Sequence, residues 1–341
     1  KRLLGTLATA DERRRADLDA LLACGQRLAA AGVQLSAYTT AANAADMRDL
    51  RVALGYKQWN VFGISYGTRL AMELARIDAE GTRSLVLDSV YPPQVNLFTA
   101  MPASYDAALR KLFDANAGLE AKFNALVDRL HAKPAAVKVR DPRTNATITM
   151  QVDGRELLEL TYRMLHTTAE LARLPAMITN AASGKYAPLA EMEARRLGRS
   201  GVFAEAMYYT VECSADLART TPVETSAAAG AFPQLAPYFA AIQEFSPGAF
   251  DLCARWGIPA PAPGMDAPLA SDVPALILAG ANDPITPPEW AQLAASTLPR
   301  SEVYTFAATS HAVITRGGCV YGLVARFLGT LSAQGSAGCG Q

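Results

Sequence analysis

The stretch NVFGISYGTRLA, residues 60–71, places one serine between two glycines at the junction of two predicted elements. The apolar run over 61–64 predicts the end of a buried strand, and apolar residues at helical spacing from Arg69 onward predict a helix. Ser65 therefore lies at a sharp strand-to-helix corner, in the pattern G-x-S-x-G. The positions beside it must be small because strand and helix nearly touch there, and the serine itself takes up a strained backbone.

Further apolar runs extend this corner into an alternating pattern of strands and helices. Strands are predicted over 59–64, 83–91, 274–280 and 302–307, and helices over 12–31, 41–54, 289–298 and 319–331. The strand runs are continuously apolar, which is typical of parallel strands covered on both faces. We therefore predict an α/β fold with a mostly parallel sheet flanked by helices.

A long, mostly helical segment interrupts this pattern. Helical spacing recurs over 108–131, 155–178 and 188–198, and one alternating piece at 146–154 predicts a hairpin strand. The expected organisation is a core whose first part is 1–93, a helical insertion over 94–267, and a second part of the core over 268–341.

Composition excludes several classes of protein. The chain has 341 residues, half of them hydrophobic, with 32 basic and 32 acidic side chains and no basic stripe, so no nucleic-acid partner is expected. Every long apolar stretch is interrupted by charge, proline or glycine within about 18 residues, which predicts no membrane span. The five cysteines form no C-x-x-C pair, so neither a metal site nor a cofactor is predicted.

The cysteine positions favour disulfides. Cys319 and Cys339 bracket the last predicted helix, and a bridge between them would pin the small-residue tail. Cys213 and Cys253 are candidates for a second bridge, the alternative being buried free thiols. Cys24 is left as a free thiol or as the partner of a cysteine outside this chain.

A serine hydroxyl is a poor nucleophile at neutral pH, so it needs a base within hydrogen-bond reach and an acid that orients the base. Of the three histidines, His131 lies at the end of a predicted helix and His166 in the middle of another. His311 alone follows a predicted strand, at the end where parallel sheets present ligand groups. His311 is therefore the candidate base.

Two aspartates compete for the role of the orienting acid. Asp283 lies in the loop after strand 274–280, one strand before His311. Asp88, in the strand that follows the serine corner, is the rival, and if it served, Asp283→Ala would leave substantial activity. The chain order Ser65, Asp283, His311 is the order of α/β-hydrolases and favours Asp283.

Four segments resemble the proline iminopeptidase and tripeptidyl aminopeptidase group of α/β-hydrolases. They are YKQWNVFGISYGTRLAMELARI (56–77), SLVLDSVYPP (84–93), PALILAGANDPITPP (274–288) and the segment around His311. In the insertion the similarity rests on YYTVECSADLA (208–218) and DLCARWGIP (251–259). The resemblance implies an α/β-hydrolase with a large, mostly helical cap.

The resemblance also implies a role for each residue. Ser65 would be the acylated nucleophile, His311 the base and then the acid, and Asp283 its orienter. The backbone N–H of Tyr66 would be an oxyanion donor. Members of this group release one or a few residues from peptides with a free N-terminus, so the cap must bind an ammonium group. Glu212 and Asp216 are the candidate carboxylates, the alternative being solvated or salt-bridged acids. A secreted or periplasmic location is expected from the cysteines and the family habit.

The chain departs from the family pattern in two places. The histidine of the family lies in a Gly-His-Gly-like loop, whereas here the segment is TSHAVI (309–314). The first 58 residues show neither a Gly-rich His-Gly-Gly-like loop nor a run of strands. We therefore expect the N-terminal strands of the fold to be missing, as in a truncated piece of a longer hydrolase, and strand 59–64 to form an exposed apolar edge.

Three functions are compatible with these residues. The first is a serine aminopeptidase that acts through an acyl-enzyme. The second is an esterase or another acyl hydrolase on the same triad, because fold and triad do not fix the substrate. The third is a non-catalytic or inactive fragment, because the loss of one oxyanion donor alone costs about 10²–10³ in rate.

Overall fold

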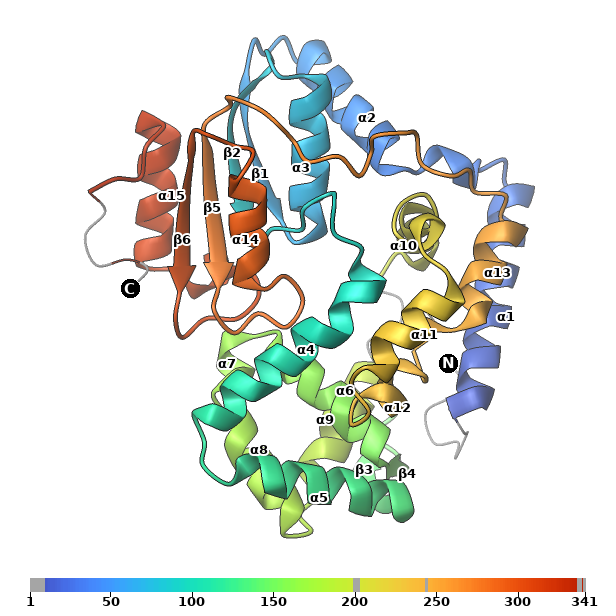
Figure 1. Cartoon of the computed structure of the whole chain (residues 1–341). Coiled ribbons are helices and arrows are strands. Elements are labelled where there is room, and N and C mark those ends of the chain that lie inside the picture. Colours follow the sequence, from blue (N-terminus) through green and yellow to red (C-terminus); the bar gives the residue numbers. More distant parts are fainter. Residues whose placement is uncertain (1–9, 199–202, 243–244, 336–338, 340–341) are drawn as a thin grey trace.

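The computed structural model describes residues 10–198, 203–242, 245–335 and 339. Its main sheet has four parallel strands in the order β1-β2-β5-β6 (Figure 1). Their bounds are β1 Trp59–Ile64, β2 Thr82–Asp88, β5 Ala275–Gly280 and β6 Ser301–Phe306. The predicted α/β fold with a mostly parallel sheet is confirmed.

Helices cover both faces of this sheet, as the continuous apolar runs predict. One face packs on α3 (Tyr66–Ile77) and α14 (Pro288–Ala295), and the other on α15 (Cys319–Thr330). Neighbouring residues of β2 point to opposite faces of the sheet. Leu87 packs with α3 and α14, whereas Val86 packs with α15. Every residue of β5 is buried, which explains why its sequence shows no polar alternation.

The pairing aligns the carboxyl ends of the four strands. Ile64 pairs with Asp88, Asp88 with Leu278, and Gly280 with Phe306. The loops that follow β1, β2, β5 and β6 therefore leave the sheet at the same edge, where open α/β sheets bind their ligands.

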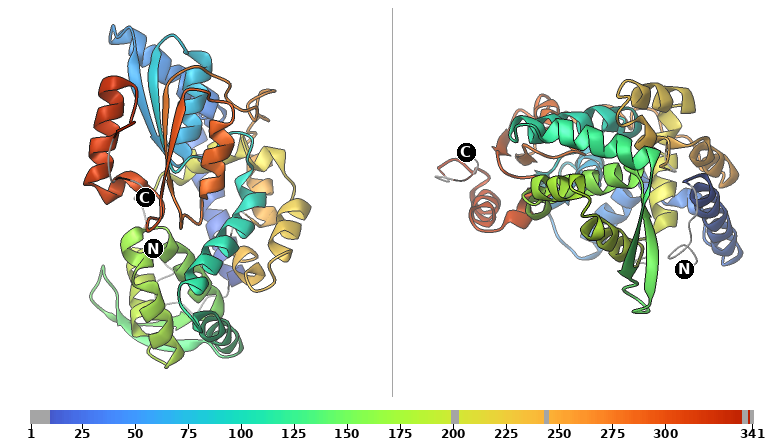
Figure 2. Two further views of the ribbon diagram at one scale, coloured as in Figure 1. Left: turned by 60° about the vertical axis from the view of Figure 1, so that its left-hand side comes forward. Right: turned by 90° about the horizontal axis from the view of Figure 1, so that it is seen from below.

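The long insertion between β2 and β5 lies beyond this edge (Figures 1 and 2). It contains α4 (Leu97–Asp114), α5 (Leu119–Ala132), α6 (Gly154–Leu165), α7 (Thr168–Leu171), α8 (Leu174–Ala182), α9 (Ala187–Gly198), α10 (Glu205–Cys213), α11 (Pro222–Gly230), α12 (Ala236–Phe239) and α13 (Pro247–Arg255). One hydrophobic cluster of its own runs from Phe98 to Ala249.

Two predicted helices of the insertion are each broken into shorter ones. The segment 108–131 divides into α4 and α5 at Gly118, whose φ of 73° is a left-handed conformation that suits glycine. The segment 155–178 divides into α6, α7 and α8, because Thr167 caps a new helix by accepting from the Glu170 N–H. The predicted hairpin strand is β4 (Thr147–Val152), and its antiparallel partner β3 (Ala135–Arg140) escaped the sequence analysis.

The two helices before β1 pack differently. Helix α1 (Ala10–Ala30) packs against α10 and α13 of the insertion through Leu21, Tyr209 and Leu252. Helix α2 (Thr40–Ala53) packs against α3, and Thr39 caps its start by accepting from the Ala42 N–H. None of the helices within the described ranges combines the length and the apolar character that crossing a membrane requires.

Strand β1 is an edge of the sheet, as predicted. Within the described ranges it pairs with β2 alone, and its Phe62 is 47% exposed. Apolar side chains of α2 and the loop after it, Leu50, Val52 and Leu54, are also exposed. An unpaired apolar edge is the liability that the sequence analysis anticipated for this strand.

Both predicted disulfides are present. Cys213 at the end of α10 is bonded to Cys253 in α13, and Cys319 at the start of α15 is bonded to Cys339. Cys24 in α1 is an unbonded, half-buried thiol. The first bridge joins two helices of the insertion, and the second ties Cys339 to the start of α15.

Candidate active site

The Ser65 corner is held in a strained conformation by its neighbours. Ser65 has φ 57° and ψ −126°, and a Cβ atom on Gly63 would lie 2.3 Å from the Gly67 carbonyl oxygen. The Ser65 N–H donates to the Asp88 carbonyl at 3.0 Å, and the Thr68 hydroxyl donates to the Ser65 carbonyl at 2.6 Å. These contacts fix an energetically costly backbone, as functional sites often do.

Helix α3 begins at Tyr66, directly after the serine and earlier than the apolar periodicity indicated. The Tyr66 N–H is therefore one of the first N–H groups of a helix, which lack partners within it. The Tyr66 hydroxyl is 2.9 Å from the Thr40 hydroxyl. Burial raises the pKa of Tyr66, and the negative charge of Glu212 adds to this rise.

His311 is paired with Asp283. Its Nδ1 lies 2.7 Å from Asp283 Oδ2, and the Asp283 side chain has no exposed surface. The carboxylate also accepts from the N–H groups of Ile285 and Thr286 at 2.8 and 3.0 Å and from the Thr286 hydroxyl at 2.7 Å. With its Nδ1–H directed to the carboxylate, the imidazole leaves Nε2 as its free acceptor.

The contact between the carboxylate and the imidazole shifts the pKa of both groups. Burial opposes ionisation of Asp283, but the hydrogen bonds from His311 and Thr286 outweigh it and lower the pKa of Asp283. Burial likewise opposes protonation of His311, but Asp283, and to a lesser degree Asp88, raise the pKa of His311 above its usual value.

The rival acid Asp88 has a different task. Its carboxylate accepts from the N–H groups of Val313 at 2.9 Å and Ile314 at 2.8 Å. The neighbouring Ser89 hydroxyl accepts from the Ala312 N–H at 2.8 Å. Asp88 therefore fixes the loop that follows His311, whereas Asp283 contacts the imidazole itself.

Ser65, Asp283 and His311 follow β1, β5 and β6 at the shared carboxyl edge. Gly280 permits the close approach of two of these loops, because a Cβ atom there would lie 2.1 Å from the Ser310 carbonyl oxygen. Within the described part of the chain the Ser65 hydroxyl makes no hydrogen bond, so its link to His311 belongs to the proposal below. Catalytic hydrogen bonds of free enzymes often tighten only with substrate.

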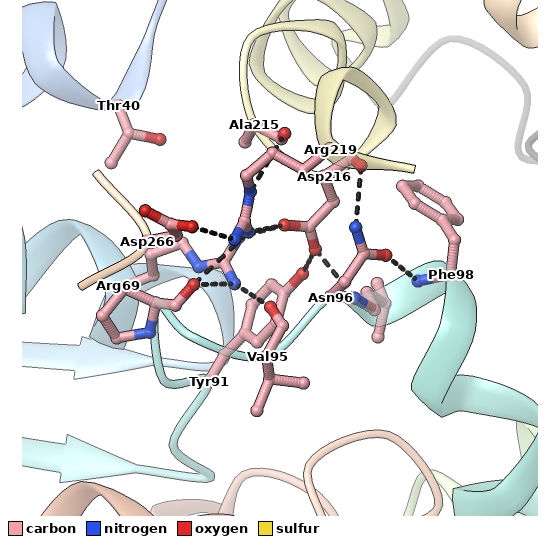
Figure 3. A network of polar contacts seen from close by, with 12 residues as sticks. Thr40, Arg69, Tyr91, Val95, Asn96, Phe98, Ala215, Asp216, Arg219 and Asp266 are labelled. Atoms are coloured by element: carbon pink, nitrogen blue, oxygen red, sulfur yellow. Dashed lines mark hydrogen bonds and ion pairs between the residues drawn. The ribbon is translucent and has the colours of Figure 1, made fainter. Parts of the chain in front are cut away.

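Asp216 lies in a buried polar network (Figure 3). Its side chain has no exposed surface and pairs with the Arg69 guanidinium at 2.8 Å and with Arg219. It also accepts from the Tyr91 hydroxyl and, at 2.8 Å, from the Leu97 N–H at the start of α4. The network joins α3, the loop after β2 and the insertion.

Arg69 is the other half of this network. Its guanidinium donates to the carbonyls of Pro92 at 3.1 Å and Val95 at 2.6 Å, and lies 3.7 Å from the Tyr91 ring centroid (Figure 3). Asp216 is thus the salt-bridged acid that the sequence analysis left as the alternative to an ammonium ligand. Glu212 in α10 is buried and has contacts of its own.

One residue near the site escaped the sequence analysis. His166 was assigned to the middle of a helix, but it lies at the end of α6 with its ring centroid 5.9 Å from that of His311. Thr167 and Thr168 follow it, and threonine is common at the start of a helix. These two residues are the signal in the sequence that the predicted helix breaks after His166. Across the described ranges, no three or more histidine, cysteine or acidic side chains are grouped as metal ligands would be.

Comparison with known proteins finds similarity over parts of the chain. Residues 239–338, which include Asp283 and His311, match the family described as TAP-like protein. A 47-residue segment is 47% identical to the proline iminopeptidase of Xylella fastidiosa strain Temecula1, covering 14% of this chain and 15% of that protein. The match thus spans a small part of its relative's length.

Solved structures of α/β-hydrolases are distant matches. The proline iminopeptidase of Mycobacterium smegmatis is 16% identical, with a TM-score of 0.39, over 86% of this chain and 73% of that one. A thermophilic esterase from Thermogutta terrifontis is 16% identical, with a TM-score of 0.33, over 85% and 72%.

The fold and the family match agree on one class of protein. The parallel sheet flanked by helices is the architecture of α/β-hydrolases, and residues 239–338 resemble the TAP-like family. Within that class it resembles the TAP-like and proline iminopeptidase group, as its sequence motifs predicted.

Replacing Asp216 should destabilise the protein strongly. Asp216→Asn leaves the buried Arg69 without its counter-charge, which typically costs about 3–5 kcal/mol in the free energy of unfolding. Urea unfolding of the two proteins measures the difference. Asp266→Asn is the matched control, because Asp266 also contacts Arg219 but its side chain is 53% exposed, so its loss should cost less than about 1 kcal/mol. Equal effects of the two substitutions would contradict the assignment.

The His311–Asp283 pair predicts a pH-dependent contribution to stability. Because folding raises the pKa of His311 above 6.5, its stabilisation is complete below that value and is lost as pH rises through the folded pKa. His311→Gln should therefore destabilise more at about pH 5.5 than at about pH 9, as measured by urea unfolding. Repeating the comparison in an Asp283→Asn background should abolish the pH dependence, and its persistence there would exclude this pair as the cause.

Proposed function

We propose that the chain is a serine hydrolase that acts through an acyl-enzyme, and that it is an aminopeptidase acting on peptides with a free N-terminus. The observation that carries the proposal is the His311 imidazole, held by a buried aspartate at 2.7 Å on the same sheet edge as the strained serine corner. The strained backbone of Ser65 and the buried pairing of His311 both cost folding free energy. A sheet edge without a function would need neither of them.

The proposed reaction gives each of these groups a role. His311 Nε2 takes the proton of the Ser65 hydroxyl while the oxygen attacks the scissile carbonyl, and the imidazolium is stabilised by Asp283. The Tyr66 N–H donates to the oxyanion of the tetrahedral intermediate. His311 then protonates the leaving amine, the carbon–nitrogen bond breaks, and an acyl-Ser65 ester remains. Water, deprotonated by His311, hydrolyses that ester and regenerates the hydroxyl.

The preference for peptides rests on the resemblance and on Glu212. In this proposal residues 94–267 form a cap over a core of 1–93 and 268–341, and the cap shapes the substrate pocket. Glu212 lies in α10 and is 6% exposed, and its charge acts on Tyr66, the residue after the nucleophile. A buried carboxylate there suits the ammonium group of a peptide N-terminus. The two disulfides support a secreted or periplasmic location, where such bonds persist.

An esterase is the second candidate function. It would use the same three side chains and the same acyl-enzyme, since the triad does not choose between an amide and an ester. It differs from the first candidate in having no use for the carboxylate of Glu212.

A fluorophosphonate probe tests the proposed chemistry directly. We expect covalent labelling of the chain at Ser65 and no labelling of Ser65→Ala, with mass spectrometry of the modified peptide as the measurement. A folded chain that is not labelled would contradict the proposed function and favour the inactive alternative. Panels of peptide and ester substrates would then separate the two candidate functions.

Glu212→Gln tests the ammonium site. Loss of a charge-assisted hydrogen bond worth about 1.5–3 kcal/mol should raise KM for peptides with a free N-terminus about 10–100-fold. The same substitution should leave N-acetylated peptides and simple esters unchanged. Glu205→Gln, at an exposed position at the start of the same helix, is the control. An equal loss on free and acetylated substrates would favour the esterase or a structural role for Glu212.

A further inference from the structure

The corner between α6 and α7, residues 165–168, lies against the loop that carries His311. The buried Ser310 donates its hydroxyl to the Leu165 carbonyl oxygen and its N–H to the Thr168 hydroxyl oxygen at 3.1 Å. These partners are more than 140 residues away in sequence, inside the insertion. The residue directly before the candidate base is therefore bonded to the insertion on both its donor groups.

The corner is itself well fixed. Helix α6 ends at Leu165, whose carbonyl is one of the last of the helix and lacks a partner within it. The Ser310 hydroxyl supplies that partner. Thr167 caps α7 by accepting from the Glu170 N–H, so the chain direction at Thr168 is set by a helix start.

Ring packing adds a third contact. The His166 ring lies between that of His311, 5.9 Å away, and that of Tyr162, 4.7 Å away. Tyr162 in turn packs on Tyr105, which is fully buried in the hydrophobic cluster of the insertion. Burial, helped by the charge that His311 carries when protonated, lowers the pKa of His166 to about 3, so this ring stays neutral beside His311.

The other anchors of the His311 loop come from the core. Asp88 and Ser89 bind the three N–H groups after the histidine, and Asp283 with Thr286 binds its Nδ1. Upstream of the histidine, the short bonds of Ser310 go to the insertion, and its hydroxyl reaches the core only at 3.5 Å from the Asn282 carbonyl. The core also holds the loop upstream of the histidine, because the Asn282 N–H donates to the Thr309 carbonyl at 3.0 Å. At Ser310 itself, the residue directly before the histidine, the shorter bonds of both donor groups go to the insertion.

We propose that Thr168 is a positioning residue for His311: through the Ser310 N–H it sets the backbone of the histidine, and with it the alignment of the imidazole on Asp283. The catalytic consequence rests on the proposed function, in which His311 is the base. The alignment of the His311 imidazole on Asp283 does not depend on the proposed function, because it involves this pair of side chains alone.

A histidine titration by NMR tests the claim without requiring activity. The chain has three histidines, so the imidazole signals can be assigned by single substitutions. The charged and titrating groups that face His311 are Asp283, Asp88 and His166. Thr168→Val keeps the shape but removes the oxygen that accepts from Ser310. We expect it to lower the pKa of His311, because a looser pair loses part of the effect of Asp283, whereas Thr168→Ser should match the parent.

Thr225→Val is the matched control. Thr225 is also a threonine of the insertion, and its hydroxyl donates to the Pro222 carbonyl at 3.1 Å, within its own helix. It should lower thermal stability without moving the titration of His311. Ser310→Ala removes the hydroxyl that donates to Leu165 and, at 3.5 Å, to Asn282, but keeps the N–H that donates to Thr168. It gives a second route and should shift the pKa of His311 in the same direction as Thr168→Val.

Labelling by a fluorophosphonate provides the catalytic readout. Misplacement of a catalytic group by about 1 Å can cost about 100-fold, so we expect the labelling rate of Thr168→Val to fall about 10–100-fold, with Thr168→Ser and Thr225→Val near the parent. A parent chain that is not labelled would count against the proposed function, while the NMR titration still decides the positioning claim. An unchanged titration of His311 in both Thr168→Val and Ser310→Ala would overturn it.

Discussion

Asp88 connects the corner that carries Ser65 to the loop that carries His311. It does so through its backbone and through its buried carboxyl group. Its carbonyl oxygen accepts from the Ser65 N–H, and its side chain accepts from the N–H groups of Val313 and Ile314. The register of β2 between β1 and β5 places it at the carboxyl edge of the sheet. The serine corner and the histidine loop are therefore set relative to each other by one residue that has no exposed surface.

The residues that follow strands could be predicted, because strand ends are visible in the sequence. Ser65, Asp283 and His311 each come after a continuous apolar run, and parallel pairing brings such ends to one edge. The acid that contacts the histidine was harder to predict, since Asp88 and Asp283 both lie at the carboxyl end of a strand. Only the geometry shows that Asp88 binds backbone N–H groups while Asp283 binds the imidazole.

The insertion resisted prediction for a physical reason. Its decisive contacts join residues far apart in sequence, such as Arg69 with Asp216 and Ser310 with Thr168. Local periodicity carries no signal of such pairs, so Asp216 was a candidate for substrate binding and His166 remained an ordinary helical residue. Helix breaks at single residues, as at Gly118, are likewise weak signals inside a long helical pattern.

The insertion is attached to both sides of the site. On one side Asp216 holds Arg69, which lies one turn into the helix that starts after Ser65. On the other side Thr168 and Leu165 hold Ser310, the residue before His311. A buried ion pair gains little net stability over apolar packing, but it is specific, because removing either partner is costly. The insertion is therefore bonded both to the helix that follows the serine and to the loop that carries the histidine, two connections that the sheet alone does not provide.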